Sequence, residues 1–409
     1  MANIQRFVTH LFLGSAFAMV LASCGGGSGG TAVAITDTSL GISTATDSST
    51  APLAGTDTGQ WDGTGGGGGS DGGGGAGDGE FIQFNFNPTT LKLNYTVINS
   101  QYGIKGQTGT LSLTPDSTNG GYKIAGSPAV NQGNIYVSKT GQVTGSLPVV
   151  IGASTVYMVF NGTRYKDAVT DLTQLAGTYF YGASFRRASN GQSPSTEWGN
   201  LRIRTDGTGR ICSLAAYSDT CSNGFEIKVA VDNPATPALV KFTTSDYRSL
   251  VGYMLAKKNS SGRGVATVDM SFSDQSGNRF TGAVYALQTI VGDSFNPNTY
   301  RGSWTIVGTD PLSPRNASTG FIQLQSNTYK QHDTVGGSDC TSTQFNDNGS
   351  ISNASTYPGM GLASGPGRSA WLIPMSDNFF VAIGADTSGT GGLSLVRRYS
   401  VTPIGAGPC

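Results

Sequence analysis

The sequence contains few of the residues that carry acid–base or nucleophilic catalysis. Its 409 residues include only two histidines, His10 and His332, and three glutamates, Glu80, Glu197 and Glu226. Beyond residue 80 it has none of the patterns G-x-S-x-G, H-E-x-x-H and Gly-Lys. These patterns mark a serine nucleophile, a zinc protease and a phosphate-binding loop. The common hydrolase and nucleotide-binding classes therefore have no support in the sequence.

The remaining acid–base groups favour structural roles. His332 lies in the polar stretch "YKQHDTVGGSDC", which predicts a solvated loop rather than a catalytic base. A glycosidase-like hydrolase needs a carboxylate pair, for which Glu197 and Glu226 are the candidates. Zinc sites use closely spaced thiol and imidazole ligands, which the sequence lacks. We therefore expect no catalytic residue, metal site or cofactor, with the carboxylate-dependent hydrolase as the alternative.

Lysine and arginine are absent between Gly25 and Leu91, a stretch that carries six aspartates and long glycine runs such as "GTGGGGGSDGGGGAGDG". A segment of this composition has almost nothing to bury and is predicted to be a disordered tether. The bases of the remaining chain are scattered, which favours a solvated surface over a nucleic-acid patch. We expect no nucleic-acid partner.

An export signal precedes this tether. Arg6 supplies positive charge, residues 7–21 supply an apolar stretch shorter than the roughly 20 residues of a permanent membrane helix, and small residues follow. The tetrad Leu21-Ala22-Ser23-Cys24 resembles the lipobox of bacterial lipoproteins, in which the signal is cleaved before a cysteine that becomes lipidated. The resemblance implies fatty acylation, such as palmitate, on Cys24. An ordinary secretory signal that ends in cysteine is the alternative.

The residue after Cys24 is Gly25. In lipoproteins, an aspartate at this position often marks retention in the inner membrane, so the resemblance implies the outer membrane. The body would then face the periplasm or the cell surface. The poly-glycine tether is also similar to those of surface-displayed lipoproteins of the transferrin-binding and factor H-binding kinds.

The chain after residue 80 has the pattern of β-strands throughout. Runs such as "LKLNYTVI" and "GFEIKVAV" alternate apolar with polar residues, and turn residues such as Asp206-Gly207 divide them at short intervals. No segment sustains a helical period. The fold class is predicted as all-β, with antiparallel barrel or sandwich units. We expect a signal peptide at 1–23, a lipidated cysteine and tether at 24–80, and β domains at 81–170, 171–291 and 292–409.

The sequence predicts two related units, at 171–291 and 292–409, with a shorter and more divergent relative at 81–170. "WGNLRIR" and "TGFIQLQ" share one pattern, and "TTSDYRSLVGYMLAKKNSSGRGVATVDM" matches "IPMSDNFFVAIGADTSGTGGLSLVRRYSV" in its Ser-Asp and Ser-Gly-x-Gly. Chance similarity among glycine-punctuated strands is the alternative. Gly302-Ser303-Trp304 is similar to the Gly-x-Trp that opens lipocalin-type barrels, and Gly177-Thr178-Tyr179 has tyrosine in its place. The resemblance implies closed barrels with Trp304 and Tyr179 in their cores.

Four cysteines remain after Cys24, an even number that favours disulfides in an exported chain. Cys212 and Cys221 bracket a short loop between two strands, so we pair them, which leaves Cys340 with Cys409. Metal binding by these thiols is the weaker alternative because no C-x-x-C occurs.

The sequence thus predicts an outer-membrane lipoprotein, held at the membrane by its N-terminal lipid, that presents β domains without catalysis. Its expected partner is a protein, a glycan or a small apolar ligand. A purely structural envelope lipoprotein and the hydrolase are the alternatives.

Replacing Cys24 with serine tests the anchor. Without the sulfur no acyl chain is attached, so the Cys24→Ser chain is expected in the soluble fraction after cell lysis, whereas the wild type sediments with the envelope. Unchanged sedimentation of the variant would refute the lipid anchor.

Overall fold

The chain is described from a computed structural model. The ranges that the structure describes are 73–76, 80–100, 104–116, 121–124, 134–137, 143–151, 154–164, 168–169, 171–189, 195–222, 224–231, 240–244, 251–259, 261–274, 276–306, 318–335, 347–354, 356–366, 368–376, 379–385 and 393–400.

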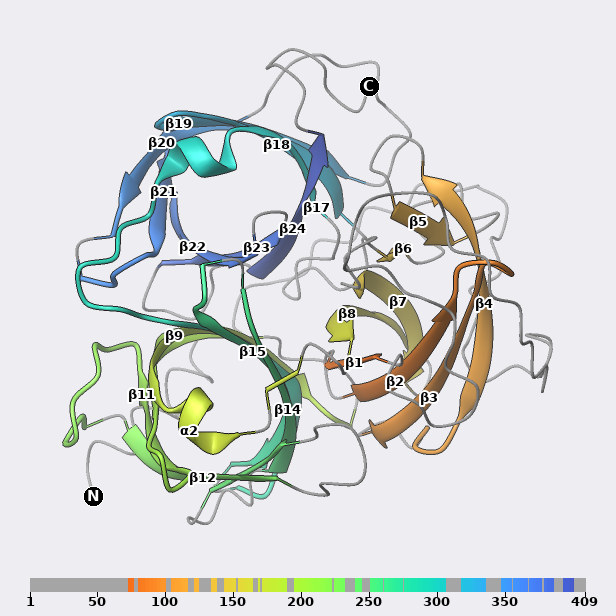
Figure 1. Ribbon diagram of the computed structural model, residues 1–409, viewed down its shortest axis with the longest axis horizontal. Coiled ribbons are helices and arrows are strands. Elements are labelled where there is room, and N and C mark those ends of the chain that lie inside the picture. Colours follow the sequence, from red (N-terminus) through yellow and green to blue (C-terminus); the bar gives the residue numbers. More distant parts are fainter. Residues whose placement is uncertain are drawn as a thin grey trace, which may run out of the picture.

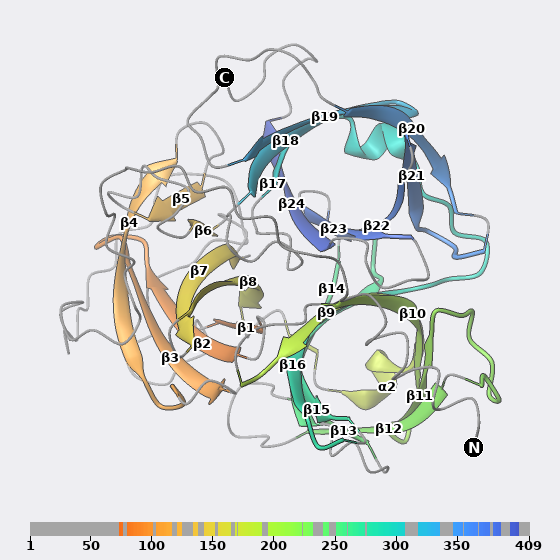
Figure 2. The same cartoon turned by 180° about the vertical axis from the view of Figure 1, so that it is seen from behind.

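These residues form three closed antiparallel β-barrels of eight strands each. The all-β prediction is confirmed, and the units are barrels rather than sandwiches. Figure 1 shows the barrels side by side in a triangle, and Figure 2 shows the same arrangement from behind. We call them the first, middle and third barrels in chain order.

The strands of each barrel follow one another along the chain. The first barrel has β1 (Gly73–Ala76), β2 (Glu80–Asn87), β3 (Lys92–Ser100), β4 (Thr108–Asp116), β5 (Gly121–Ile124), β6 (Asn134–Val137), β7 (Val143–Ile151) and β8 (Ser154–Arg164). The middle barrel has β9 (Gly177–Arg187), β10 (Ser195–Ile203), β11 (Thr208–Ser213), β12 (Gly224–Val231), β13 (Val240–Thr244), β14 (Val251–Lys258), β15 (Gly264–Ser273) and β16 (Arg279–Gln288). The third barrel has β17 (Gly302–Ile306), β18 (Ser318–Gln325), β19 (Thr328–Val335), β20 (Asp347–Asn353), β21 (Gly361–Gly365), β22 (Arg368–Ser376), β23 (Phe379–Gly384) and β24 (Leu393–Ser400).

A short helix covers one end of the middle barrel and one end of the third. Helix α2 (Leu172–Leu175) precedes β9, and the 3-10 helix η3 (Pro297–Tyr300) precedes β17. The hydroxyl of Tyr179 donates to the carbonyl of Leu175 at 2.7 Å, and Nε1 of Trp304 donates to the carbonyl of Tyr300 at 2.8 Å. Both aromatic side chains are core residues, as predicted, with exposed fractions of 1% and 0%. We call these covered ends the plugged ends.

The middle barrel has walls of two kinds. In β12, Phe225, Ile227 and Val229 are buried in the interior while Glu226 and Lys228 are exposed, the alternation expected of a barrel wall in water. Strands β9, β15 and β16 instead run through eight consecutive buried residues. Both faces of these three strands are therefore covered, the inner face by the barrel core and the outer face by the neighbouring barrels.

The third barrel covers the plugged-end part of that outer face with apolar side chains. Phe180, Trp198, Tyr357 and Trp371 form an aromatic cluster, with ring centroids of Phe180 and Tyr357 4.8 Å apart and those of Trp198 and Trp371 5.5 Å apart. Tyr357 and Trp371 belong to the third barrel and the other two rings to the middle barrel. Burial of such rings is the largest apolar contribution that single residues make to an interface.

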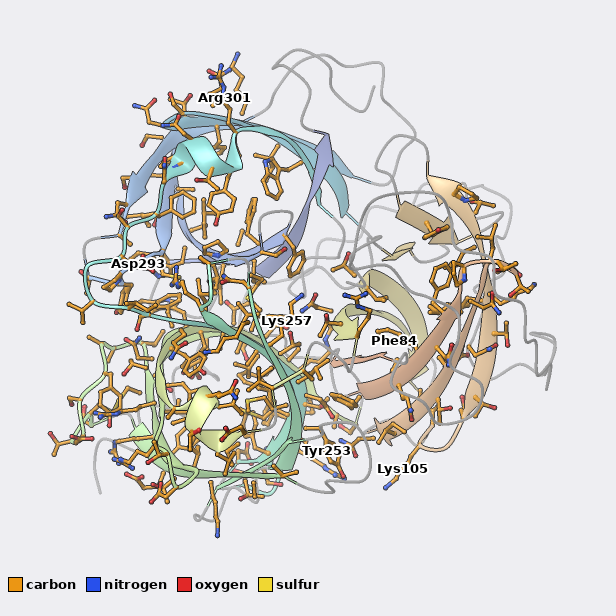
Figure 3. All side chains as sticks on the ribbon, in the orientation of Figure 1. Phe84, Lys105, Tyr253, Lys257, Asp293 and Arg301 are labelled. Carbon is orange, nitrogen blue, oxygen red and sulfur yellow. A yellow bond between two sulfur atoms is a disulfide. The ribbon has the colours of Figure 1, made fainter. Side chains whose placement is uncertain are left out.

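The first barrel meets the middle barrel through a mixed contact. Phe81 packs on Leu255 and Tyr253, and the ring centroids of Phe81 and Tyr253 lie 5.8 Å apart. Asn161 Nδ2 donates to Thr267 Oγ1 at 2.7 Å. Figure 3 shows Tyr253 and Lys257 on the side of the middle barrel that faces the first barrel. The contact therefore combines apolar packing with paired polar groups, as a buried polar interface requires.

All three barrels meet at one point. A cavity of about 20 Å³ is lined by Thr163 of the first barrel, Lys257 and Thr267 of the middle barrel and Met375 of the third. Nζ of Lys257 lies 3.4 Å from Oγ1 of Thr163. The middle barrel is thus the element that the other two share.

Part of the predicted repeat is wrong. The motifs Gly-x-Tyr and Gly-x-Trp both open a first strand, and "WGNLRIR" and "TGFIQLQ" both lie in second strands. The Ser-Gly-x-Gly segments, however, connect the sixth and seventh strands of the middle barrel but the seventh and eighth strands of the third. The longer correspondence is therefore offset by one strand and reflects similar turn composition rather than equivalent position.

Two local predictions have different outcomes. Asp206-Gly207 forms the predicted hairpin turn between β10 and β11, with Gly207 at φ +80° and Oδ1 of Asp206 accepting from the Thr208 amide at 2.9 Å. His332 was predicted in a loop, but its backbone pairs with Phe321 inside β19. The residues from Lys330 to Thr334 are polar at consecutive positions, so the sequence there lacks the alternation that would have predicted a strand.

The strands β9, β15 and β16, on which the neighbouring barrels pack, are called the shared wall. Replacing Phe180 with alanine tests this packing. The substitution removes a fully buried ring from the aromatic cluster and is expected to lower the free energy of unfolding by about 3–5 kcal/mol in denaturant titrations. Lys228→Ala, on the exposed face of β12, is the control and is expected to change it by less than about 0.5 kcal/mol. Equal effects of the two substitutions would refute the shared wall.

Candidate functional site

The two glutamates proposed for a hydrolase point to opposite faces of the middle barrel. Glu197 lies on the inward-facing positions of β10, where Oε1 accepts from Ser213 Oγ at 2.7 Å and from the hydroxyl of Tyr181. Glu226 lies on the outer face of β12, where Oε1 is 2.7 Å from Nη1 of Arg210. The barrel wall separates the two carboxylates, so they do not form a glycosidase-type pair across one substrate.

Glu197 serves as the hydrogen-bond acceptor for two hydroxyl groups inside the barrel, those of Tyr181 and Ser213. The hydroxyl of Tyr181 is buried above the apolar core, and a buried hydroxyl needs a partner. Within the described ranges no three His, Cys, Asp or Glu side chains are placed so that they could hold a metal ion.

The connection between β11 and β12 is closed by a disulfide. Cys212 and Cys221 are joined in a disulfide, with Sγ atoms 2.02 Å apart and Cα atoms 5.9 Å apart. We call the segment from Cys212 to Cys221 the stapled loop. In Figures 1 and 2 it lies on the outer wall of the middle barrel, on the side away from the first barrel.

Two arginines of β10 and its turn hold the stapled loop against the wall. Cζ of Arg202 lies 5.3 Å from the ring centroid of Tyr217, a cation–π distance. Nη2 of Arg204 lies 3.3 Å from Oδ1 of Asp219, which also accepts from the hydroxyl of Tyr217. The loop is therefore fixed at its tip as well as at its ends.

A third arginine holds the end of the loop. Nη2 of Arg210 donates to the carbonyl of Cys221 at 2.9 Å, while Nη1 pairs with Glu226. Gly224 is required beside this contact, because a Cβ atom there would collide with Sγ of Cys221. Leu214 adopts φ +52°, the left-handed region that side chains rarely enter, and its amide donates to the Trp198 carbonyl at 2.7 Å. The disulfide and these contacts together set the path of the loop.

The charges of the loop are set by these contacts. The hydrogen bond from Tyr217, and then the Arg204 and Arg202 guanidinium groups, hold the pKa of Asp219 below its ordinary value of 3.8. Burial, and then the hydrogen bond to Asp219, raises the pKa of Tyr217. A lowered carboxyl pKa adds stability above the unfolded pKa, and this stability is lost as pH falls through the folded pKa. The contacts of Asp219 with Tyr217 and Arg204 are therefore fully formed at neutral pH, and they weaken in acid below about pH 4. We call the contacts of Arg202, Arg204 and Arg210 with the loop the arginine brace.

The loop presents small and polar groups to solvent. Ala216, Ser218 and Thr220 are exposed, while Tyr217 is half-buried between Arg202 and solvent. The sequence indicated the disulfide but not the arginine brace. The sequence does carry a signal for this brace. Arg202 and Arg204 stand at alternate positions at the end of β10, and Arg210 stands in β11, so strand periodicity places all three on the outer face as neighbours.

Other predicted site residues lie outside the described residues. Cys24, Cys340 and Cys409 are among these, so lipidation and the second disulfide stay predictions. None of the helices in the described part of the chain has the length and hydropathy that a membrane span requires.

Comparison with known proteins finds only distant likeness. No protein-family model and no curated protein matches the sequence. Among solved structures, a protein of unknown function from the DUF3598 family of Nostoc punctiforme is 8% identical, covers 54% of this chain and 94% of its own, and has a TM-score of 0.24. A double mutant of the vaccine antigen transferrin binding protein B from Haemophilus parasuis is 9% identical, covers 78% of this chain and 65% of its own, and has a TM-score of 0.23. At these TM-scores neither likeness carries an argument about this chain.

Removing the disulfide tests how much it stabilises the loop. For a closed loop of this length, the pair Cys212→Ser and Cys221→Ser is expected to lower the free energy of unfolding by about 2–3 kcal/mol, because the unfolded chain gains freedom. Thr220→Ser leaves the disulfide in place and is the control. An unchanged unfolding midpoint in the double variant would refute a stabilising role.

Proposed function

We propose that this protein is an outer-membrane lipoprotein, anchored by fatty acyl chains on Cys24, that uses its three-barrel body to bind a partner protein without catalysing a reaction. The export signal, the lipobox tetrad and the glycine-rich tether in the sequence support the anchor. The disulfide between Cys212 and Cys221 is consistent with an oxidising compartment.

The observation that carries the binding role is the bracing of the stapled loop. A disulfide, a cation–π contact, the Arg204–Asp219 ion pair and the hydrogen bond from Arg210 to the Cys221 carbonyl hold the loop. Bracing of this kind lowers the conformational entropy that a loop loses when it binds. An exported loop held in one conformation is therefore suited to recognition.

The chemistry of the loop favours a protein partner. Tyrosine and arginine are the residues that most often dominate protein interfaces, and Tyr217 and Arg202 are stacked at the centre of this surface. Charges of both signs, from Arg204 and Asp219, lie beside them. Such a mixed surface offers paired hydrogen bonds and charges to a partner protein.

The other candidate functions have less support. A small apolar ligand would need space in the middle barrel, whose interior is occupied by buried side chains from β9 to β12 and β14 to β16, including Tyr181, Phe225 and Met270. A hydrolase would need two carboxylates on one face of the wall, which Glu197 and Glu226 do not provide. Substituting Glu197, which lies inside the barrel and away from the arginines that hold the loop, with alanine is expected to leave partner binding intact.

Site-specific crosslinking tests the partner surface. A photo-reactive amino acid at Thr220 in the stapled loop is expected to crosslink one partner protein in cells that display this protein. The matched control carries the same residue at Ser276, an exposed position in the β15–β16 turn across the barrel, and is expected to yield no such adduct.

The staple provides the second control. Combining the Thr220 probe with Cys212→Ser and Cys221→Ser is expected to reduce the adduct, because the loop no longer holds one conformation. The proposal is contradicted by an adduct of equal yield at both probe positions, or by one that persists without the disulfide.

A further inference from the structure

The linker between the middle and third barrels exposes two large apolar side chains. Val291 is 98% exposed and Ile290 is 48% exposed, and they are the exposed large hydrophobic residues of the described chain. We call this pair the apolar tip. Scattered apolar side chains are common on protein surfaces, but a fully exposed one beside a second invites an explanation.

The apolar tip is held outward by the structure around it. Thr289 donates from its amide and its hydroxyl to the carbonyl of Thr178, at 2.8 and 3.0 Å. On the other side of the tip, Oδ2 of Asp293 lies 3.3 Å from Nη1 of Arg263, and Phe295 is buried in the third barrel. Figure 3 shows Asp293 in the linker between the two barrels. Because both ends are fixed, the tip cannot turn inward to bury its side chains without breaking these contacts.

The tip lies at the plugged ends of the middle and third barrels, which are neighbours. Arg263, in the turn between β14 and β15 at the plugged end of the middle barrel, lies against Gly359 in the turn between β20 and β21 of the third. The linker that carries the tip joins β16 to η3 at this same end.

The chain enters the first barrel on this side of the body. Gly73, the first residue of β1, pairs with Arg164 at the end of β8. One residue earlier in β8, Thr163 contacts Lys257, which lies next to the plugged end of the middle barrel. The tether was predicted over 24–80, and β1 lies within that range as a strand of the first barrel, so the residues before β1 carry the rest of the proposed tether and the lipid. The attachment of the body to its tether and the apolar tip therefore share one side.

We propose that the apolar tip inserts into the lipid surface to which the chain is anchored, so that the plugged ends face the membrane. This inference rests on the proposed lipid at Cys24. A tether raises the effective concentration of a weak second contact, so two apolar side chains are sufficient to bias orientation. At the plugged ends the bases Lys258 and Arg301 and the acid Asp171 are exposed, and Asp293 is partly exposed. With both signs present, apolar burial rather than charge drives the contact.

Fluorescence quenching in vesicles tests the insertion. The full-length lipidated protein with Val291→Trp is reconstituted in phosphatidylcholine vesicles, with or without bromine on the acyl chains, and compared with the wild type. The fluorescence of Trp at position 291 is obtained by subtracting the wild-type spectrum. Its emission maximum is expected to shift to shorter wavelength, and brominated lipid is expected to quench more than half of its intensity. Because contact does not depend on charge, the loss is expected to persist in about 1 M salt.

A tryptophan in place of Thr220, in the stapled loop, is the matched control and is expected to show neither change. Flotation of the vesicles separates the possible failures. A chain that floats while Trp emission from position 291 is not quenched overturns the insertion and leaves the anchor standing. A chain that does not float overturns the anchor, and with it the insertion.

Discussion

The burial of strands β9, β15 and β16 on both faces is the constraint on which the rest of this structure depends. On the outer face of these strands, pairing aligns Val265, Leu287 and Phe180 in one apolar row near the plugged end, and Ser271, Thr281 and Arg186 in a polar row at the other end. The third barrel packs on the apolar end through the aromatic cluster. The first barrel meets this wall through the hydrogen bond from Asn161 to Thr267 of β15, and it packs on the neighbouring strand β14 through Phe81. One wall thus joins three barrels into one body.

This arrangement determines which surfaces are available for recognition. In Figure 1 the stapled loop lies on the outer wall of the middle barrel that carries β11 and β12, on the side away from the first barrel, and only Leu214 at its start packs against the aromatic cluster. The plugged ends, in contrast, gather on one side together with the entry of the chain into β1. With the proposed tether on that side and a braced loop on the outer wall, the body would present the loop in a defined orientation.

The sequence predicts the fold class well because alternation and turn residues are local signals. It identified Tyr179 and Trp304 as core residues and the pairing of Cys212 with Cys221. It did not reveal the shared wall, because strand alternation separates an apolar from a polar face but does not say what the second face meets. Outer-face positions of β15 such as Thr267 and Asp269 read as solvent-facing and are buried. The arginine brace was missed for a related reason, since contacts between strands depend on register, which the sequence does not state.

The claim that the barrels form one body through the shared wall is tested most directly by calorimetric unfolding of the full chain. Barrels that depend on one wall unfold together, so the account predicts one heat-absorption peak whose calorimetric enthalpy equals the van't Hoff enthalpy. Barrels that are independent units would unfold in separate peaks, or in one peak with a calorimetric enthalpy about three times the van't Hoff value. Either of those results would contradict the account.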